Sequence, residues 1–451
     1  MIRRFRFPTL LALVVGLIAL GIVSSGSAVT ATGNEPGDVI PGQFIILTEP
    51  GADPAQVAAD HAARPLHVYT VAARGFAARL SQAKVDALLA DPRVNNVVPD
   101  RVVSLLCHKP QHPCNGGGGT TTSSQVLPAG VKRVGADQVW GTTTGNGVGV
   151  AVVDTGLDFN HTDLSVAASC FTAFTSCQDD HGHGTHVGGT IAARNNTQDV
   201  VGVAPNATLY AVKVLDQNGS GTWSGVIAGV DWVTQNASTL GIRVANMSLG
   251  GSGSNSANCG DPNLDGVIDD PLHKAICNSV GAGVTYVVAA GNSASGEISQ
   301  SVPAAYPEVM AIASTTAVDG SNACKSFSGS ITADTASYFT TDGVGVSVSA
   351  PGEEKENINR GCLISSVGVL SLKLGGGTTR MSGTSMSAPH VSGVVALMLQ
   401  LNPALTPADV RSKIESSAHR KGTAPLNSPT SSYSFDGERE GIASAPGATT
   451  P

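Results

Sequence analysis

The sequence predicts an α/β protein with a mostly parallel sheet flanked by helices, preceded by a small α+β domain. From residue 130 onward, continuous apolar or β-branched runs alternate with helical segments, which is typical of a parallel sheet covered on both faces. Residues 39–103 carry a separate pattern of shorter strands and helices. The composition agrees, because 54 Gly, 41% hydrophobic and 13% charged residues among 451 indicate a compact globular chain rather than a disordered or fibrous one.

The first 31 residues are organised like a secretory signal peptide. Three arginines within the first six residues precede an apolar run at residues 10–23, and small residues follow up to Ala31. The run is shorter than the ~20 apolar residues of a membrane-spanning helix. We therefore expect cleavage after Ala28 or Ala31, a secreted (extracellular) protein and no membrane association afterwards. An uncleaved anchor is the alternative interpretation.

The charge pattern argues against a nucleic-acid partner. The formal net charge is -8 at pH 7, and no run of Lys and Arg follows the N-terminus. Proteins that bind DNA or RNA usually carry a basic patch or stripe. Because the sequence offers no such footprint, no nucleic acid is expected among its partners.

The eight cysteines of an exported chain are expected to form disulfides. Eight cysteines allow 105 pairings, so the sequence alone does not select one. Their order favours four local pairs: Cys107 with Cys114, Cys170 with Cys177, Cys259 with Cys277, and Cys324 with Cys362. None has the paired CxxC spacing of a zinc site, which argues against a metal at these cysteines.

Residues 39–103 follow the order strand, helix, strand, strand, helix, strand. The predicted strands are residues 43–47, 67–71, 75–80 and 94–98, and the first helix is the Ala-rich segment 54–63. Ser81 is a typical N-cap for the second helix, whose apolar face carries Val85, Leu88 and Leu89. This βαββαβ order is that of a ferredoxin-like unit. The Gly-, Thr- and Ser-rich stretch 115–124 has no periodicity and is predicted to be a linker.

Four runs in the larger domain are predicted to be buried strands, because each is continuously apolar or β-branched. They are residues 148–153, 208–214, 244–248 and 284–290. In parallel sheets the chemistry collects at the carboxyl ends of the strands. Asp154 follows the first strand immediately, although a carboxylate in that place often only caps the next helix.

Two further motifs supply the other groups of a nucleophilic site. Residues 181–186 read His-Gly-His-Gly-Thr-His and open a helical run, and residues 383–390 read Gly-Thr-Ser-Met-Ser-Ala-Pro-His where another helix begins. Three histidines alone suggest a metal cluster, but the HExxH pattern is missing. A serine hydroxyl needs an imidazole to take its proton, and the imidazole needs a carboxylate to fix its tautomer. Backbone amides at the start of a helix favour the oxyanion that forms on attack.

The three motifs together closely resemble the signatures of subtilisin-like serine proteases. They are residues 154–158, 183–187 and 383–390, in the Asp, His, Ser order for which subtilisin itself is the known example. The resemblance covers nearly the whole chain after the linker, and residues 39–106 look like the inhibitory propeptide of the same family. It implies a secreted, broad-specificity serine endopeptidase that works through an acyl-enzyme.

The resemblance assigns a role to each reactive residue. Asp154 orients the base, His183 is the general base and acid, and Ser385 is the nucleophile. Only His183 heads the Gly-Thr-His sequence of the family. We therefore expect a packing role for His186 and a position on the loop surface for His181.

The resemblance also assigns the oxyanion hole and the substrate groove. Asn292 matches the family's oxyanion-hole asparagine, a donor worth ~10² to 10³ in turnover by measurement on subtilisin itself. Members of the family hold the substrate as an extended strand between two edge segments. The predicted substrate-binding residues are Gly219, Ser220 and Gly221, then Ser248, Leu249 and Gly250, and at the specificity pocket Ala290, Gly291 and Ser301. Backbone binding implies broad specificity, and the absence of an obvious carboxylate near the pocket implies an apolar preference.

The resemblance implies a self-processing zymogen. The predicted domains are a signal peptide at 1–31, an inhibitory propeptide at 32–106, an N-terminal linker segment at 107–129, a subtilisin-like catalytic domain at 130–440 and a tail at 441–451. Self-cleavage is expected after Leu106, with Leu106 in the first pocket and Val103 in the fourth, and a cut within the Gly-rich linker is the alternative. The expected partners are protein or peptide substrates and the chain's own propeptide, as inhibitor and chaperone of a monomer.

No cofactor is expected for catalysis, but structural calcium is predicted at two places. By resemblance, Asp163 and Asn196 belong to the family's stabilising calcium site, where oxygen atoms gather around a hard cation. Residues 261–270 have the Asp/Asn spacing and the Gly of an EF-hand-like loop. Its candidate ligands are Asp261, Asn263, Asp265 and Asp269. Leu272 stands where such a loop has Glu, so a solvated acidic loop clamped by a disulfide is the alternative.

Two other functions remain for comparison. A lipase or esterase would place its serine in G-x-S-x-G and ahead of the histidine, which is the wrong order here. A secreted peptide-binding pseudoprotease has the same fold, since fold does not determine function. Every catalytic position keeps its reactive residue, which favours the enzyme.

Overall fold

The computed structural model describes residues 35–106, 124–294, 296–431 and 439–450. Within this part of the chain, the central sheet has seven strands in the order β14-β13-β11-β9-β5-β7-β6, and every pair is parallel. The strands are β5 (Gly149–Asp154), β6 (Phe171–Thr172), β7 (Thr208–Lys213), β9 (Ile242–Met247), β11 (Thr285–Ala289), β13 (Met310–Thr316) and β14 (Val346–Glu353). The predicted parallel sheet is confirmed, and β6, β13 and β14 are additions to the four predicted strands.

Helices cover both faces of this sheet, as the continuous apolar strands require. Along β5, Val150 and Val152 point into one core, and Ala151 and Val153 point into the other. The first core is shared with α3 (Ala129–Arg133), α4 (His183–Ala192), α7 (Thr384–Leu401), α8 (Pro407–Ser416) and α9 (Ala445–Thr449). The second is shared with α5 (Trp223–Leu240) and α6 (Pro271–Gly281).

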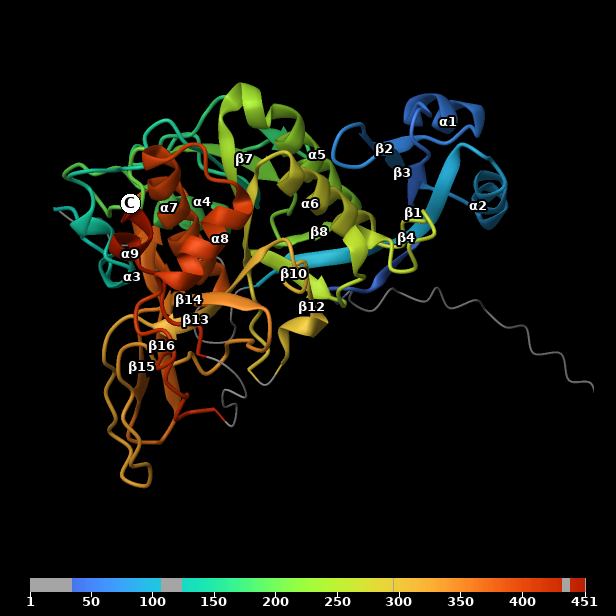
Figure 1. Ribbon diagram of the computed structural model, residues 1–451. Helices are drawn as coiled ribbons and strands as arrows, with labels where there is room; N and C mark the ends of the chain where they lie inside the picture. The colour runs from blue at the N-terminus through green and yellow to red at the C-terminus, as the bar shows by residue number, and fades with distance from the viewer. Residues whose placement is uncertain (1–34, 107–123, 295, 432–438, 451) are drawn as a thin grey trace, which may run out of the picture. The chain divides into compact units, whose positions relative to one another are not determined.

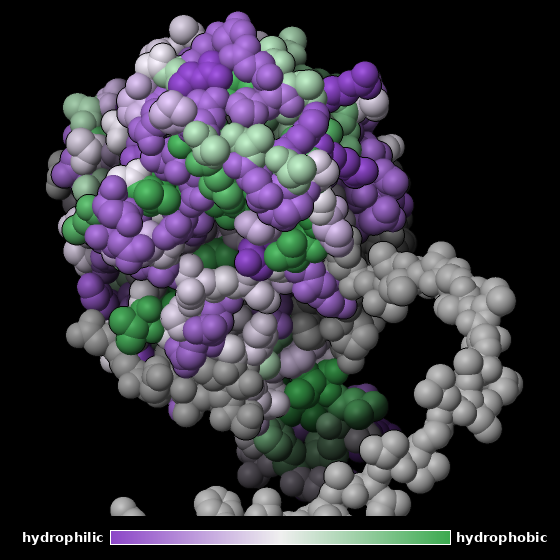
Figure 2. All heavy atoms as spheres, turned by 90° about the vertical axis from the view of Figure 1, so that its right-hand side faces the viewer, coloured by the Kyte–Doolittle hydropathy of each residue, from purple (hydrophilic) through white to green (hydrophobic). Residues whose placement is uncertain are grey.

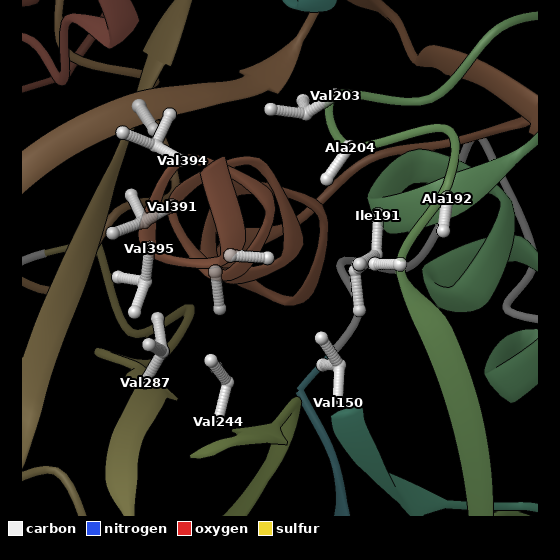
Figure 3. Packing of buried hydrophobic residues seen from close by; sticks show 14 of the residues in the cluster. Val150, Ile191, Ala192, Val203, Ala204, Val244, Val287, Val391, Val394 and Val395 are labelled. Atoms are coloured by element: carbon white, nitrogen blue, oxygen red, sulfur yellow. The ribbon is translucent and has the colours of Figure 1, made fainter. Parts of the chain in front are cut away.

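The buried helix α7 lies at the centre of the first core. Figure 3 shows its Val391, Val394 and Val395 beside Val287 and Val244 of the neighbouring strands. At the C-terminal end of the chain, α9 packs into the same core through Ala445 and Ala448, which are buried. The sheet therefore meets α7 over much of its length, and this contact fixes the place where α7 begins.

The N-terminal domain has the predicted βαββαβ order. Its elements are β1 (Val39–Thr48), α1 (Pro54–Asp60), β2 (Pro65–Tyr69), β3 (Gly75–Arg79), α2 (Gln82–Leu89) and β4 (Val94–Leu105). The strands pair antiparallel in the order β4-β1-β3-β2. Ser81 is the N-cap residue of α2, but its side chain makes no capping hydrogen bond, so the expected cap is only positional.

The strand β4 is much longer than the predicted 94–98. Beyond its pairing with β1, it lies between β8 (Ser220–Thr222) and β10 (Leu249–Ser252), and β10 pairs in turn with β12 (Ser301–Val302). Figure 1 shows β4 running from the N-terminal domain toward β10. One sheet therefore joins the two domains, and the residues after 98 extend the strand because they find two partner edges.

Hairpins and short helices complete the described residues. The hairpins are β15 (Lys355–Ile358) with β16 (Ile364–Val367) and β17 (Val369–Leu372) with β18 (Thr378–Met381); the 3-10 turns are Ala136–Gln138, Asn258–Gly260 and Ile298–Gln300. Three predicted disulfides are present, namely Cys170–Cys177, Cys259–Cys277 and Cys324–Cys362. The predicted pair Cys107 and Cys114 lies outside the described residues.

The surface on the side of the N-terminal domain is largely hydrophilic, with apolar residues between the polar ones (Figure 2). In the described part of the chain, no helix is both long and apolar enough to cross a membrane. The predicted signal peptide at 1–31 lies outside the described residues.

Two glycines of the helices on the same sheet face test how tightly that face is packed. A Cβ on Gly229 of α5 would lie 2.8 Å from Val212 Cγ1 and 2.9 Å from Val214 Cγ1, whereas a Cβ on Gly281 of α6 would meet nothing within 4 Å. We expect Gly229→Ala to destabilise the protein by ~1 to 3 kcal/mol through overpacking. Gly281→Ala is expected to be neutral or stabilising by up to ~1 kcal/mol. Thermal unfolding of both variants checks this, and equal Tm values would contradict the packing argument.

Candidate active site

A buried carboxylate and imidazole meet where β5 ends and α4 begins. His183 Nδ1 lies 2.8 Å from Asp154 Oδ1 and 3.0 Å from Oδ2, and both side chains are fully buried. The Thr155 backbone N–H also donates to Asp154 Oδ1 (2.7 Å). A carboxylate on Nδ1 keeps the proton there, which leaves Nε2 with its lone pair. Nε2 has no hydrogen-bond partner among the described residues, so it is available as a base.

Ser385 is the second residue of α7, directly after the N-cap Gly383 and Thr384. Its Oγ donates to the carbonyl oxygen of Leu106 (2.6 Å) and to that of Ser248 (3.0 Å) rather than to His183. Leu106 follows β4, so the hydroxyl is occupied by the end of the N-terminal domain. The structure thus brings Asp154 and His183 into hydrogen-bond contact and places Ser385 on the carbonyl group of Leu106.

Asn292 approaches the same carbonyl oxygen from another side. Its Nδ2 donates to Leu106 O, and its Oδ1 accepts from the Thr384 backbone N–H (2.9 Å) and hydroxyl (3.2 Å). Thr384 is the residue before Ser385, and these two bonds to it fix the orientation of the Asn292 amide. A fixed amide donor on a carbonyl oxygen can stabilise the negative charge that develops there during attack.

The segment before Leu106 is held as a strand between two edges. On one side Val102, Val103 and Ser104 pair with Thr222, Gly221 and Ser220, and the Leu105 N–H donates to Gly219 O (3.0 Å). On the other side Ser104 and Leu105 pair with Gly250 and Leu249, and the Leu106 N–H donates to Ser248 O (3.4 Å). All six residues predicted for the two edges of the groove therefore line this segment.

Comparisons with known proteins agree with this geometry. Residues 145–435 match the model of the subtilase family, and residues 47–106 match that of the peptidase inhibitor I9. The chain belongs to the subtilase family. It is a serine endopeptidase related to the subtilisins, with an I9 inhibitor domain before the catalytic domain.

Relatives of this subtilase include bacterial proteases. It is 37% identical to an alkaline protease of Alkalihalobacillus alcalophilus, over 77% of this chain and 74% of that protein. It is 36% identical to subtilisin DY of Bacillus licheniformis, over 66% of this chain and 94% of that protein. A crystal structure of a cold adapted subtilisin-like serine proteinase matches with a TM-score of 0.49 and 32% identity, covering 65% of this chain and 92% of the other.

Small residues of the subtilase domain lie beside Leu106 and after β11. A Cβ on Gly250 would lie 3.0 Å from Leu106 Cδ1. Ala290 and Gly291 follow β11, and a Cβ on Gly291 would lie 2.9 Å from Thr341 Oγ1 and 3.5 Å from Ser301 Oγ. A side chain at Gly250 would press on Leu106, and one at Gly291 would press on Thr341, so both positions favour glycine.

The two histidines next to His183 differ in their surroundings. His186 is fully buried, its Nε2 contacts Val369 O (3.0 Å), and burial lowers its pKa to about 3. His181 is half-buried rather than on the loop surface, and burial followed by the charge of His183 lowers its pKa. Its Nε2 lies 3.6 Å from a Cβ built on Gly219, so it borders the groove.

Two buried carboxylates that sequence reasoning missed connect the inhibitor domain to the start and middle of α5. Asp231 of α5 accepts the backbone N–H groups of residues 70–73, at 3.0, 2.8, 2.6 and 3.4 Å. Asp100 of the inhibitor domain accepts the N–H (3.1 Å) and hydroxyl of Ser224, in the first turn of α5. A carboxylate within an apolar helical run could have drawn attention to Asp231. Its hydrogen-bond partners could not be found from the sequence, because they lie more than 150 residues away.

The first predicted calcium site contains a buried carboxylate, Asp163, and a group of carbonyl oxygens around the side chain of Gln125. Asp163 is fully buried, accepts from Asn196 Nδ2 (2.5 Å), and its Oδ2 has no partner among the described residues. Gln125 Nε2 lies 2.7 Å from Arg194 O, 3.2 Å from Gln198 O and 3.1 Å from Val200 O. Gln125 was missed because it lies about 40 residues before Asp163 at the end of the predicted linker.

The second predicted calcium loop uses its polar groups differently. Asp261 accepts the backbone N–H groups of Asp265 (3.2 Å) and Gly266 (3.0 Å), and Asp265 accepts that of Val267 (3.0 Å). Asp269 accepts from Asn96 of the inhibitor domain (3.2 Å). Asn263 lies in the exposed part of the loop, and the buried side chain of Leu272 replaces the usual twelfth-position ligand.

One group of ligand-type atoms in the described residues is closed to a metal. Cys259, Cys277 and Glu308 lie close enough to hold an ion, but the two sulfur atoms are bonded to each other. A disulfide offers no thiolate, which a metal at cysteine needs. The prediction that these cysteines do not bind metal agrees with this pairing.

The contact of Asp231 with residues 70–73 is expected to anchor the inhibitor domain. Asp231→Ala leaves four backbone N–H groups without their acceptor, at a cost of ~1 to 3 kcal/mol for buried donors. We expect faster hydrogen exchange at residues 70–73, by a factor of ten or more. Asp86→Ala is the control, because the described contact of Asp86 is with Gln82 in the same helix. Unchanged exchange in Asp231→Ala would contradict the anchoring role.

Proposed function

We propose that this subtilase is a secreted serine endopeptidase that hydrolyses peptide bonds with Asp154, His183 and Ser385 and is made as a self-processing zymogen. One observation carries the proposal. The carbonyl oxygen of Leu106 accepts from both Ser385 Oγ and Asn292 Nδ2, at the end of a strand held in the groove. That is the arrangement expected of an acyl group that has just been released, or is about to be attacked.

Each residue has a defined step in the proposed reaction. Asp154 holds His183 Nδ1–H, so that Nε2 can take the proton of Ser385 Oγ as this oxygen attacks the carbonyl carbon. The negative oxygen of the tetrahedral intermediate is stabilised by Asn292 Nδ2. His183 then gives its proton to the leaving amine, and the acyl-enzyme forms. A water molecule, deprotonated by His183, releases the acyl group in the same way.

The proposed specificity is broad with an apolar preference. Strand pairing on both sides of residues 102–105 uses backbone groups, which every substrate offers. The side chains that this chain presents at the first and fourth positions before the cut are Leu106 and Val103, and Val103 is buried in the core shared with α5. Small residues at Gly250 and Gly291 leave room for an apolar side chain and offer no charge to pair with.

The proposed zymogen is cut after Leu106, and residues 32–106 then act as inhibitor and folding chaperone of a monomeric enzyme. The fit of Leu106 at Ser385 supports this cut over one in the Gly-rich linker. Secretion is proposed from the signal-like pattern of residues 1–31. Pairing of β4 with β8 and β10 supports both inhibition, because it fills the groove, and assistance in folding, because it supplies a strand.

Calcium is proposed at Asp163, Asn196 and Gln125. A buried carboxylate with an unpartnered oxygen and several converging carbonyl oxygens suit a hard cation, which prefers oxygen ligands. When bound, the ion would neutralise Asp163 and tie residues 194–200 to Gln125, which lies shortly before α3. The loop at 261–270 stays a prediction only, since Asp261 and Asp265 already accept backbone N–H groups.

The nucleophile is tested with Ser385→Ala, in parallel with the wild type and Ser387→Ala. Loss of a triad serine costs roughly 10⁶ in kcat in subtilisin itself, the source of that magnitude. We expect Ser385→Ala to keep its inhibitor domain uncut and to leave casein intact. The wild type and Ser387→Ala are expected to begin at Cys107 and to cleave casein. N-terminal sequencing and a casein assay provide both readouts.

Other outcomes of this experiment are decisive as well. Processing and activity in Ser385→Ala would show that another residue is the nucleophile. A wild type that remains uncut and inactive would favour a peptide-binding pseudoprotease. A wild type that is cut but inactive until residues 32–106 are degraded would agree with inhibition by the retained domain.

Calcium at Asp163 is expected to stabilise the protein more at pH 8 than at pH 5. Burial raises the pKa of Asp163 to about 6 without a cation, so stability from its protonated form is lost as pH rises toward 6. Calcium binds the carboxylate and restores that stability above pH 6. The Tm of Ser385→Ala with calcium or with chelator measures the effect. Adding Asp163→Asn should abolish it and adding Asp261→Asn should not; equal calcium shifts in both would refute the site.

A further inference from the structure

Two glutamates lie buried behind the turn that carries Ser385. Glu353 ends β14, Glu356 lies on the hairpin strand β15, and both side chains are inaccessible to solvent. The residue before Glu353 contacts the turn directly, because Gly352 O accepts the N–H of Gly383 (3.0 Å). The proposed mechanism uses neither carboxyl group, and neither residue belongs to a motif of the sequence.

A chain of hydroxyl groups connects the glutamates to the turn. Ser366 Oγ donates to Glu353 Oε2 and lies 2.8 Å from Ser382 Oγ, and Ser382 precedes Gly383. Glu356 Oε1 accepts the Tyr338 N–H (2.7 Å), and its Oε2 accepts from Thr430 (2.8 Å). Glu353 Oε1 is the oxygen of the pair with no partner identified among the described residues. Three of the four carboxyl oxygens are therefore fixed.

The two carboxyl groups contact each other without a basic residue between them. Glu356 pairs with Ser366 across the hairpin and Ser366 donates to Glu353, which brings the two carboxyl groups within hydrogen-bond reach of each other. Burial first raises the pKa of both, with the charge of Glu356 raising that of Glu353 further. Two carboxylates that both accept cannot hydrogen-bond, so the contact requires a proton on one of them. A shared proton would also give Glu353 Oε1 its missing partner.

Other titratable groups near the pair do not neutralise it. Burial first, and then the charges of both glutamates, raise the pKa of Tyr338, which adds no positive charge. Arg380 of β18 is paired with Glu354, and Arg133 of α3 is paired with Asp334. The helix α7 contributes His390, which is buried with its Nδ1 on Met386 O and has a pKa lowered by burial to about 4. At neutral pH His390 is uncharged and gives the pair no positive charge. A proton on one of the two glutamates is then what removes the repulsion between them.

We propose that Glu353 and Glu356 share one proton and position the turn at Ser382 and Gly383, so that loss of that proton displaces Ser385 and limits activity at alkaline pH. The inference rests on Ser385 as the nucleophile, which the proposed function contains. Both glutamates are positioning residues, since they act through Ser366, Ser382 and Gly352. When both ionise, two like charges repel in a buried site and the hydrogen bonds to the turn weaken.

The test compares Glu353→Gln and Glu356→Gln with Glu354→Gln in the full chain. Gln has the size of Glu and can donate a hydrogen bond as the protonated acid does, but it cannot ionise. Glu354 serves as the control because it lies between the two glutamates in sequence and contacts Arg380 instead. Above the pH at which the shared proton is lost, wild-type kcat is expected to fall about tenfold per pH unit. In both pair variants kcat is expected to change less than about twofold over that range, with KM unaffected, and Glu354→Gln is expected to follow the wild type.

A second readout does not depend on activity. Infrared difference spectra of the Ser385→Ala chain should contain the carbonyl band of a protonated carboxylic acid at neutral pH that titrates with the alkaline limit. Burial raises the pKa of Glu440 to about 8, so Glu440 adds a second acid band at neutral pH. The band of the pair is the one that should be lost in Glu356→Gln and persist in Glu440→Gln. If the Gln variants do not fold, Glu356→Asp, which keeps the carboxyl, must retain the band.

Three results would overturn the proposal. They are an alkaline limit unchanged in both pair variants, an infrared band absent from the wild-type background, or a limit that calcium raises in the wild type but not in Glu356→Gln. The last would show that a cation, not a proton, joins the carboxylates. Failure of the proposed function is separate, because it would show as activity in Ser385→Ala while the infrared band is unaffected.

Discussion

The parallel register of the central sheet is the constraint on which the rest of the site depends. Because all seven strands of this sheet run the same way, their carboxyl ends meet at one edge. Asp154 ends β5, Ser248 follows β9, Asn292 lies three residues after β11, and Gly352 near the end of β14 holds the turn before Ser385. The two sheet-facing helices α4 and α7 then only have to begin at that edge to add His183 and Ser385.

Features that depend on local pattern could be predicted from the sequence. The continuous apolar run around Val150 gave β5, and the Gly-rich motifs around His183 and Ser385 gave the starts of α4 and α7. Three disulfides join neighbouring cysteines in the sequence, so their order was enough. The strands β13 and β14 were missed because small and hydroxyl residues replace the branched ones, as in Met310–Thr316.

Features that depend on distant partners could not be predicted. Asp231, Gln125 and Glu356 are single polar residues whose meaning comes from groups up to about 160 residues away. The acidic loop illustrates an ambiguity of local pattern, because the spacing of Asp261 and Asp265 satisfies a metal-binding pattern and equally well a turn stabilised by its own N–H groups. A periodicity or motif predicts which residues lie on the same side of a helix or strand. It does not predict which distant residues they contact.

The continuity of β4 implies that the proposed cut after Leu106 would not by itself free the groove. The strand pairs with β1 in the inhibitor domain and with β8 and β10 in the catalytic domain, so the new chain end stays part of a folded sheet. Asp100 and Asp231 add charged acceptors at α5, away from the bond that is cut. Release must therefore break these contacts together or unfold the inhibitor domain. On the proposed function, the stability of residues 35–106, more than the chemistry at Ser385, would then set when the enzyme becomes active.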